Sequence, residues 1–576
     1  MRLNKVTLHN FRSFKHTSFN LMDYGLLVGE NNVGKSTLID ALRIFYEEDK
    51  AKFSESRDFP KFKTEDNESW IEIEYLTTDE EQNSLKEEYC SSDNILKVRK
   101  YLKSDDSDLV KSRQSNIYAY EDGELSKNLF YGAKNISQSK LGQVIYIPEI
   151  STTSETLKLS GPSPLRGMIY FVFNKVIKNS EAYSNLNEAF ETFNKNMQEE
   201  KSEGLSMDKL INDINSELDQ WDVNFGFEIN PIDPKQIVKR LLSHYIEDQN
   251  LDGERVNIET FGQGLQRHLI YKLIVLSSKY TEKKTGKNKE FDPDFTLILF
   301  EEPEAFLHPT QQEQINLSLR EISEEKNQQV LATSHSPIFV SEDVKELNSI
   351  VRLTKSNAES STHQLDKDGI NNLWKDNVEL SKYFEELLED DDVPTCVKNK
   401  IKNDKLDKKE ENLEVKLEKE SIRYFLRLDN ERASLFFSNK IIICEGPSEK
   451  KYFEFLINQK WKDLRKEQVY FFNAIGKFNI HRYMNLFGKL GIPHSVLMDK
   501  DNNNHYHKYL NNFIEKNENE YTDKISSFED DLEAFLDIEK PDRRDLKPAN
   551  IFMNHHNDNI DEEKIQELKS KIKSLI

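Results

Sequence analysis

The chain has few cysteines, no long hydrophobic run and no excess of positive charge. Its 576 residues include only 3 cysteines, which lie far apart and fit neither a zinc-site spacing nor a disulfide framework. A reducing, cytoplasmic location is therefore expected. No apolar run approaches the roughly 20 residues that cross a bilayer, and residues 1–21 lack the apolar core of a signal peptide. The sequence thus predicts a soluble protein that does not use a membrane as a partner.

The net charge of -23 argues against capture of nucleic acid by bulk positive charge. It leaves open a site that holds phosphates through bound divalent metals, because such a site concentrates acids and needs only a local basic rim. The length exceeds the roughly 250 to 300 residues at which a single core stops growing, so several domains are expected.

A phosphate loop is predicted near the N-terminus. Residues 29–37, GENNVGKST, fit G-x-x-x-x-G-K-[ST] between an expected strand at 25–28 and an expected helix at 36–45. Lys35 would contact the β and γ phosphates of ATP, and Ser36 would ligate Mg²⁺. The predicted nucleotide-binding residues here are Gly29, Asn32, Gly34, Lys35, Ser36 and Thr37.

A second apolar strand, expected at 296–300, ends in the acids Glu301 and Glu302. This pattern predicts one carboxylate for the Mg²⁺ shell, Glu301, and one that polarises the attacking water, Glu302. The strand expected at 330–333 leads into His335, which is predicted to contact the γ-phosphate.

Two further apolar strands end in acid in the last third of the chain. Residues 441–444 lead into Glu445, and residues 496–498 lead into Asp499 and Asp501. If the second strand continued, both aspartates would point the same way and Glu445 would converge on them. Clustered hard oxygen ligands suit Mg²⁺ or Mn²⁺, and paired metals about 3.5 to 4 Å apart serve many nucleases. Metal-dependent phosphoryl chemistry is the resulting prediction.

The phosphate loop, the EEPE segment followed by Leu307-His308-Pro309, and Thr-Ser-His-Ser-Pro at 333–337 resemble ATP-binding-cassette ATPases of the SMC and RecF branch. Residues 261–267 lie where that family carries a signature segment that closes on ATP held by a second head. The resemblance implies nucleotide contacts from Gly262, Gly264 and Gln266, and a homodimer or higher homo-oligomer formed through the heads. The signature serine is replaced by Gly262, which departs from the family pattern.

With the two acid-ended strands after this head, the whole chain resembles nucleases of the OLD (overcoming lysogenization defect) family, whose C-terminal half is a Toprim domain. The resemblance implies catalytic roles for Glu445, Asp499, Asp501 and Lys547. It implies two Mg²⁺ or Mn²⁺ ions held by a set of acids. This metal-binding set comprises Glu445, Glu449, Asp499, Asp501 and a further acid, either Glu529 or Glu533, of which Glu529 is preferred.

The function implied is an ATP-binding, metal-dependent DNA endonuclease in which the ATPase head gates cleavage. By analogy it would act in anti-phage defence, as in Gabija-type or retron-associated systems, with a helicase or a reverse transcriptase as second component. Two alternatives stay open: an ATP-binding sensor or scaffold with an inactive Toprim domain, and a Toprim nucleotidyltransferase such as a primase.

The fold class expected is α/β: an ABC-type ATPase head with a helical insertion, followed by a Toprim domain. The expected division has the first half of the head at 1–150, a mostly helical insertion at 151–250, the second half of the head at 251–375, a charged helical connector at 376–430 and the Toprim domain at 431–576. An apolar helical stripe in the insertion predicts either core packing or, as the minority interpretation, a dimerisation surface. The stripe consists of Leu210, Ile211, Ile214, Leu218 and Trp221.

Overall fold

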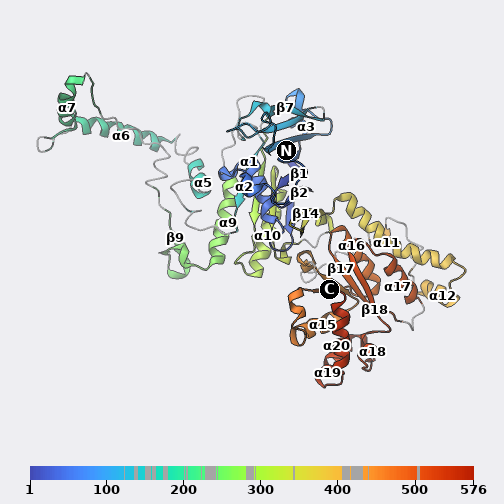
Figure 1. The fold of residues 1–576 in the computed structure, drawn as a ribbon. Coiled ribbons are helices and arrows are strands. Elements are labelled where there is room, and N and C mark those ends of the chain that lie inside the picture. Colours follow the sequence, from blue (N-terminus) through green and yellow to red (C-terminus); the bar gives the residue numbers. More distant parts are fainter. Residues whose placement is uncertain are drawn as a thin grey trace. The chain divides into compact units, whose positions relative to one another are not determined.

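The structure is a computed structural model, and it divides into two compact units (Figure 1). The first unit contains residues 1–146, 289–305 and 309–576, and the second contains residues 147–288 and 306–308. The residues described are 1–121, 123–134, 136, 141–149, 157, 164–172, 180–199, 202, 205–221, 223–226, 242, 244–279, 291, 293–340, 344–404, 406, 415–416, 419, 433–438, 440–501 and 506–576. Most of residues 405–430, the second half of the expected connector, therefore lie outside the described residues.

The chain begins with an antiparallel sheet in the order β2-β1-β4-β5-β6-β7. Its strands are β1 (Arg2–Phe11), β2 (Phe14–Asn20), β4 (Ser69–Leu76), β5 (Ile95–Lys103), β6 (Ile117–Glu121) and β7 (Glu124–Leu129). The sequence pattern of β4 predicts an edge strand, but this prediction is wrong because β4 pairs with β1 on one side and β5 on the other. Its polar Glu72 tolerates burial because Lys97 and Arg99 on the neighbouring strand pair with it at 2.9 and 2.7 Å.

A second sheet, in the order β14-β13-β3-β12-β11-β8, carries the predicted nucleotide site. Its strands are β3 (Tyr24–Val28), β8 (Gln143–Ile147), β11 (Thr296–Glu301), β12 (Gln328–Thr333), β13 (Ile350–Ser356) and β14 (Glu359–Gln364). The four central strands are parallel and buried, so their carboxyl ends meet at one edge. The helices α1 (Lys35–Tyr46) and α10 (Pro309–Glu324) pack against this sheet. The short helices α2 (Glu55–Asp58) and α3 (Asp79–Ser84) lie in the segments before and after β4.

The described part of the second unit is largely helical, and the unit extends beyond the expected insertion at 151–250. Its elements are α5 (Pro164–Val172), α6 (Glu181–Glu199), α7 (Met207–Leu218), β9 (Ile246–Asp248), β10 (Glu254–Val256) and α9 (Gln263–Lys279). The interpretation of the apolar stripe as part of a core is wrong, because α7 buries none of its residues and the side chains of Leu210 and Trp221 are 46% and 61% exposed. Self-association through this stripe stays a prediction. No helix among the described residues is long and apolar enough to cross a membrane.

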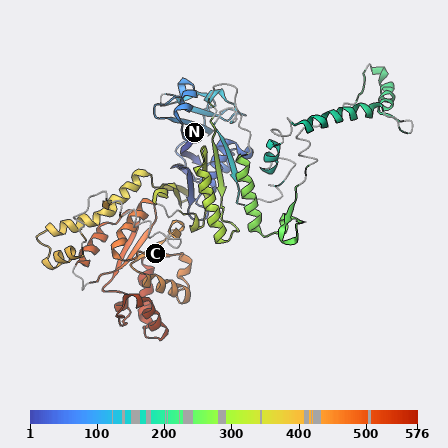
Figure 2. The same ribbon diagram turned by 180° about the vertical axis from the view of Figure 1, so that it is seen from behind.

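The C-terminal domain has four parallel strands in the order β16-β15-β17-β18 (Figure 2). These are β15 (Ile441–Cys444), β16 (Tyr470–Asn473), β17 (His494–Asp499) and β18 (Thr522–Phe528). Ile442, Cys444 and Leu497 face one core, which includes α15 (Pro447–Gln459) and α20 (Glu562–Lys573). Because strand side chains alternate, Ile443 and Val496 face the opposite side of the sheet, where α16 (Ile480–Lys489) packs on β17. The sheet is thus covered on both faces, as a parallel sheet requires.

The remaining helices of this region are α11 (Lys367–Glu389), α12 (Thr395–Asn403), α17 (His507–Lys516), α18 (Leu532–Phe535) and α19 (Lys547–His556). Helix α11 packs against α16, and its apolar residues Leu373, Leu380 and Phe384 are buried. The expected connector therefore begins within a helix that packs against α16.

Candidate functional site

The phosphate loop joins β3 to α1, as the sequence predicts. Gly29 and Gly34 have φ values of 137° and 110°, which L side chains rarely adopt. A Cβ on Gly29 would lie 2.5 Å from the carbonyl oxygen of Leu353, so the backbone passes this neighbouring strand closely. Ser36 and Thr37 lie in the first turn of α1, where backbone N–H groups are available to a phosphate.

Lys35 turns back onto the loop that precedes it. Its Nζ donates to the carbonyl oxygens of Gly29 and Glu30 at 3.0 and 2.8 Å. Burial lowers the pKa of Lys35 to about 8, and the negative charges of Glu302 and Glu304 oppose this shift. The side chain is thus held beside the loop by backbone acceptors that a phosphate oxygen could replace.

The acids after β11 lie beside the residues that follow β12. Glu302 has φ 43°, and its N–H donates to the carbonyl oxygen of Thr333 at 3.1 Å. Nε2 of His335 is 3.3 Å from Oε1 of Glu302. Glu301 accepts a hydrogen bond from the Tyr146 hydroxyl at 2.6 Å. The structure therefore brings Glu302 and His335 together at the carboxyl edge of the sheet.

Glu304 is a residue of this edge that the sequence analysis did not assign. Its Oε1 accepts from the Ser334 hydroxyl at 2.8 Å and from the N–H groups of His335 and Ser336 at 2.5 and 3.2 Å. Burial raises the pKa of Glu304. Glu304 thus fixes the backbone that carries His335, and the last acid of EEPE was the only signal for this role.

Gly262, Gly264 and Gln266 belong to the second unit, at the start of α9. The amide nitrogen of Gln266 donates to the carbonyl oxygen of Phe261 at 2.8 Å, which ties the side chain to the preceding turn. Their contact with a nucleotide held by another head stays a prediction.

In the C-terminal domain, two of the predicted acids stand at the ends of adjacent parallel strands. Glu445 follows β15, Asp499 ends β17, and Oε2 of Glu445 lies 3.5 Å from the Asp499 amide nitrogen. Burial and the charges of Glu445 and Glu449 raise the pKa of Asp499 well above its usual range. Burial also raises the pKa of Glu445. A cation placed among these acids would relieve this electrostatic cost.

Glu449, in the first turn of α15, joins the same cluster. Burial and the charges of Glu445 and Glu533 raise its pKa to about 7, although Lys547 opposes the shift. Oε2 of Glu449 and Oε1 of Glu533 are buried and have no hydrogen-bond partner among the described residues. Nζ of Lys547 lies 3.3 Å from Oε2 of Glu533. Unpartnered, buried carboxylate oxygens are the donors that a hard divalent cation takes.

The position of Asp501 corrects one sequence-based expectation. Strand β17 ends at Asp499, and Asp501 has φ 49°, so the strand does not continue and the two aspartates do not share a face by alternation. Asp501 Oδ2 instead lies 2.8 Å from both Nζ of Lys477 and Nδ1 of His507. Although burial opposes it, these two hydrogen bonds lower the pKa of Asp501.

Lys477 is the residue of this site that the sequence analysis missed. Its side chain is 2% exposed, and Nζ also contacts the carbonyl oxygen of Asp499 and lies 3.8 Å from Oε2 of Glu445. A buried ammonium thus stands between Glu445 and Asp501. The Gly476-Lys477 pair after β16 was the only sequence signal, and lysines are too common in this chain for that pair to be distinctive.

The structure separates the two candidates for the further acid. Glu533 is 2% exposed and adjoins Lys547 and Glu449, whereas the side chain of Glu529 is 84% exposed and lies 2.5 Å from Lys500. The geometry therefore favours Glu533 over the preferred Glu529.

Within the described residues, no three His, Cys, Asp or Glu side chains already have an arrangement that would hold a metal ion. The donor chemistry nevertheless fits Mg²⁺ or Mn²⁺, because the unpartnered oxygens of Glu449 and Glu533 belong to the same buried cluster as Asp499. Residues Glu445, Glu449, Asp499 and Glu533 are thus the ones suited to hold such an ion.

Comparison with known families identifies two domains in this chain. Residues 1–340 match the family described as AAA ATPase domain, and residues 436–501 match the family described as overcoming lysogenization defect protein-like, TOPRIM domain. An ATPase head on an α/β sheet followed by a Toprim domain is therefore the class of this protein. The chain belongs to the AAA ATPase domain family, and its C-terminal part carries an OLD-like Toprim domain.

Two curated nucleases are similar to this chain. The Old nuclease of Escherichia phage P2 is 25% identical over 355 residues, which are 59% of this chain and 57% of that protein. Endonuclease GajA of Bacillus cereus (strain VD045) is 21% identical over 529 residues, 87% of this chain and 75% of that protein. This chain thus spans just over half the length of the Old nuclease. A solved SMC head bound to the C-winged helix domain of ScpA has a TM-score of 0.36 and 14% identity, covering 65% of this chain and 100% of that one.

Proposed function

We propose that this chain is a DNA endonuclease that depends on Mg²⁺ or Mn²⁺ and cleaves phosphodiesters at the acid cluster of its Toprim domain. The observation that carries the proposal is the clustering of the buried Glu449, Asp499 and Glu533 with the half-buried Glu445, where the pKa values of Glu445, Glu449 and Asp499 are raised. Maintaining several buried carboxylates is costly for stability, and the cost is offset when cations bind. The names of the nuclease relatives support the same activity.

In the proposed mechanism, Glu445, Glu449, Asp499 and Glu533 hold the ions, of which we propose two. Bound Mg²⁺ or Mn²⁺ would supply an activated water and stabilise charge on the phosphate oxygens. Lys547, 3.3 Å from Glu533, is placed to neutralise negative charge that develops on the phosphate. Lys477 and His507 hold the Asp501 carboxylate in place, so we propose a positioning role for Asp501.

The DNA backbone needs a basic surface near these acids, despite the net charge of -23. Lys571 is influenced by the like charges of Lys500 and Lys524, so three lysines gather around the end of β18. We propose that this group forms the basic rim of the DNA path.

We propose that ATP with Mg²⁺ binds at the phosphate loop and gates cleavage. Lys35 and Ser36 would contact the phosphates and the ion, Glu301 would complete the ion's shell, and Glu302 would orient water with help from His335. The Glu302–His335 distance of 3.3 Å supports this pairing. Dimerisation of heads across ATP, through Gly262, Gly264 and Gln266, belongs to the same proposal.

The biological role we propose is anti-phage defence in the cytoplasm with a second component, such as a helicase or a reverse transcriptase complex. Support comes from the ATPase and OLD-like Toprim domains and from the similarity to endonuclease GajA over 87% of this chain.

The experiment that tests the nuclease proposal incubates the purified full-length chain with supercoiled plasmid and Mg²⁺ or Mn²⁺, with and without ATP. Cleavage by the wild-type chain and its loss in Glu445→Ala are expected. Equal activity in both, or none in either, would favour the alternative of an ATP-binding scaffold with an inactive Toprim domain. RNA synthesis on a primed template would instead support a nucleotidyltransferase.

A further inference from the structure

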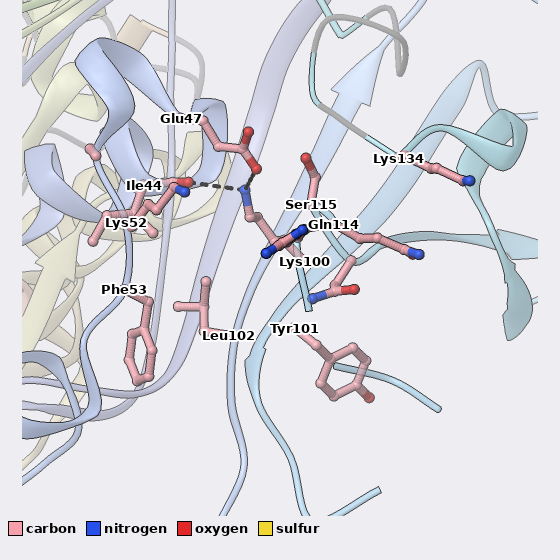
Figure 3. Close-up of a pocket in the computed structure, with 13 residues that line it drawn as sticks. Ile44, Glu47, Lys52, Phe53, Lys100, Tyr101, Leu102, Gln114, Ser115 and Lys134 are labelled. Carbon is pink, nitrogen blue, oxygen red and sulfur yellow. Dashed lines mark hydrogen bonds and ion pairs between the residues drawn. The ribbon is translucent and has the colours of Figure 1, made fainter. Parts of the chain in front are cut away.

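A cavity of about 330 Å³ lies in the ATPase head, away from both sites described above (Figure 3). The end of α1, strand β5 and the segment before β6 line it. Its volume is within the range of about 300 to 1,000 Å³ that small-molecule sites occupy. The lining carries four cationic residues, Lys52, Lys100, Arg113 and Lys134, and one carboxylate, Glu47. This is a strong local excess of positive charge in a chain with net charge -23.

The one carboxylate of the cavity is already engaged. Nζ of the buried Lys100 lies 2.8 Å from Oε1 of Glu47 and donates to the carbonyl oxygens of Ile44 and Phe45 at 3.1 and 3.0 Å, as Figure 3 shows for Glu47 and Ile44. Among the described residues, no acid pairs with Lys52 or Arg113, both of which are exposed. The cavity therefore keeps uncompensated positive charge.

The rest of the lining is divided between polar and apolar groups. Ser115 is 2% exposed, and the Oε1 atom of Gln114 is buried without a hydrogen-bond partner in the described part of the chain. Phe53 and Leu102 supply an apolar wall. A ligand that fills the cavity would thus combine an anionic group with a less polar body.

We propose that this cavity binds a small phosphate-bearing molecule of the nucleotide or phosphorylated-metabolite class, at a site separate from the phosphate loop. Lys52 and Arg113, which make no direct ion pair among the described residues, favour a polyanion, and a guanidinium such as that of Arg113 matches phosphate oxygens in geometry. The volume of about 330 Å³ favours a small molecule over a nucleic-acid backbone.

The cavity adjoins the far end of the helix that begins at the phosphate loop. Helix α1 starts at Lys35 and ends at Tyr46, and Lys100 holds two carbonyl groups of its last turn. Occupation of the cavity is therefore expected to order residues 44–47, since these residues form one of its walls.

The test uses inorganic pyrophosphate as the probe, in EDTA, with the full-length Lys35→Ala chain so that the phosphate loop does not contribute. Isothermal titration calorimetry should detect binding. The double variant Lys52→Glu/Arg113→Glu, added to that background, should weaken it at least 10-fold. The matched control Lys111→Glu/Lys127→Glu reverses two exposed charges outside the cavity and should leave the affinity unchanged.

Hydrogen exchange provides a second readout that needs no cavity variant, since pyrophosphate should slow exchange of the amides of residues 44–47 in the Lys35→Ala chain. Absence of pyrophosphate binding, or equal binding by the charge-reversed and control variants, would overturn the proposal. A short single-stranded oligonucleotide is titrated in parallel. If charge reversal weakens oligonucleotide binding and leaves pyrophosphate binding unchanged, the cations serve a nucleic-acid backbone and the small-molecule site is refuted.

Discussion

Glu449 and Glu533 each bury one carboxylate oxygen that makes no hydrogen bond within the described residues. Such an atom costs free energy on the order of 1 to 3 kcal/mol in a folded protein, and more if the group is charged. The pKa of Glu449, raised to about 7 mainly by burial, reflects the same cost. In the proposed function, two such atoms next to Lys547 and the acids of β15 and β17 are ligands for a divalent cation.

The first prediction separates the two candidate acids with a matched pair of substitutions. Glu533→Gln should weaken Mn²⁺ binding by roughly 10-fold or more and suppress plasmid cleavage, because it removes a buried anionic donor. Glu529→Gln, at a side chain that is 84% exposed and pairs with Lys500, should change neither. The measurement is Mn²⁺ affinity by electron paramagnetic resonance. Weaker binding in Glu529→Gln together with unchanged binding in Glu533→Gln would identify Glu529 as the ligand instead.

The second prediction concerns Glu304, which positions His335 rather than touching the nucleotide. Glu304→Ala removes the acceptor of three hydrogen bonds from residues 334–336, so His335 should lose its fixed place beside Glu302. ATP affinity should change less than 3-fold while the ATP hydrolysis rate falls about 10-fold or more. A matched control is Glu313→Ala, an exposed acid on α10. Equal loss of affinity and rate in Glu304→Ala would assign Glu304 to binding instead.

At this scale the sequence predicts the acids better than the cations. Glu445 and Asp499 could be identified because each follows an apolar strand, and the chemistry of such positions is distinctive. Lys477 could not, because its importance depends on a turn that brings it beside Asp501, 24 residues further along the chain. The left-handed backbone at Asp501 likewise depends on tertiary contacts rather than on a local pattern.

At the scale of elements, the hairpin of β13 and β14 carries a half-buried histidine, His363. Nε2 of His363 lies 3.0 Å from the Thr354 hydroxyl, and the ring lies against Gly491. Burial, with a smaller effect of the Arg352 charge, lowers the pKa of His363 to about 4. His363 is therefore neutral in the folded protein over a pH range in which it is charged in the unfolded chain.

The third prediction follows from the sign of that shift. Since the folded-state pKa is lowered, the stabilising contribution is fully present above the unfolded value of about 6.5 and is lost as the pH falls towards 4. Between pH 7 and pH 5 the loss should be about 2 kcal/mol. Urea denaturation should show that His363→Gln loses less stability than the wild-type chain over this interval. Identical losses in the two proteins would contradict the assignment.

Most strands of both parallel sheets are predictable because uninterrupted apolar runs that end in polar residues read clearly in the sequence. Strand β4 shows why some placements are not: its alternating acids indicate an edge, yet Lys97 and Arg99 on β5 neutralise Glu72 inside the sheet. Partners of this kind come from a neighbouring strand, which a local pattern does not reveal. The burial of the apolar stripe on α7 could not be predicted either, because its helical periodicity fits both a core and an exposed face.

At the scale of the whole molecule, Arg352 links the sheet of the nucleotide site to the Toprim domain within the first unit. Its side chain is buried, and it donates to the carbonyl oxygens of Gly491 and Ser438 at 2.7 and 3.0 Å. Burial lowers its pKa to about 10. Strand β13, which carries Arg352, pairs with β3 directly before the phosphate loop, and Gly491 directly precedes the segment that leads into β17. This connection is a route by which nucleotide state could reach Asp499.

The fourth prediction tests this link. Arg352→Met should destabilise the protein by about 3 kcal/mol, because it leaves buried carbonyl groups without their donor. Differential scanning calorimetry should then resolve a separate, earlier unfolding transition of the Toprim domain. Arg352→Lys keeps the charge but not the planar guanidinium. Its stability should lie between that of the wild-type chain and that of Arg352→Met. A single unshifted transition in Arg352→Met would contradict this role.

The domain order was predictable at this scale, because the phosphate loop and the acid-ended strands are recognisable without a structure. The cationic cavity was not, since its lining comes from residues 44 to 134 and no one segment of them is strongly basic.

The measurement that tests the central claim most directly is anomalous X-ray scattering from crystals of the full-length chain soaked in Mn²⁺. The account predicts anomalous density bonded to Asp499 and to at least one of Glu445, Glu449 and Glu533. Ordered acids at this edge of the β15–β17 sheet with no Mn²⁺ among them, at a concentration that saturates plasmid cleavage, would contradict it.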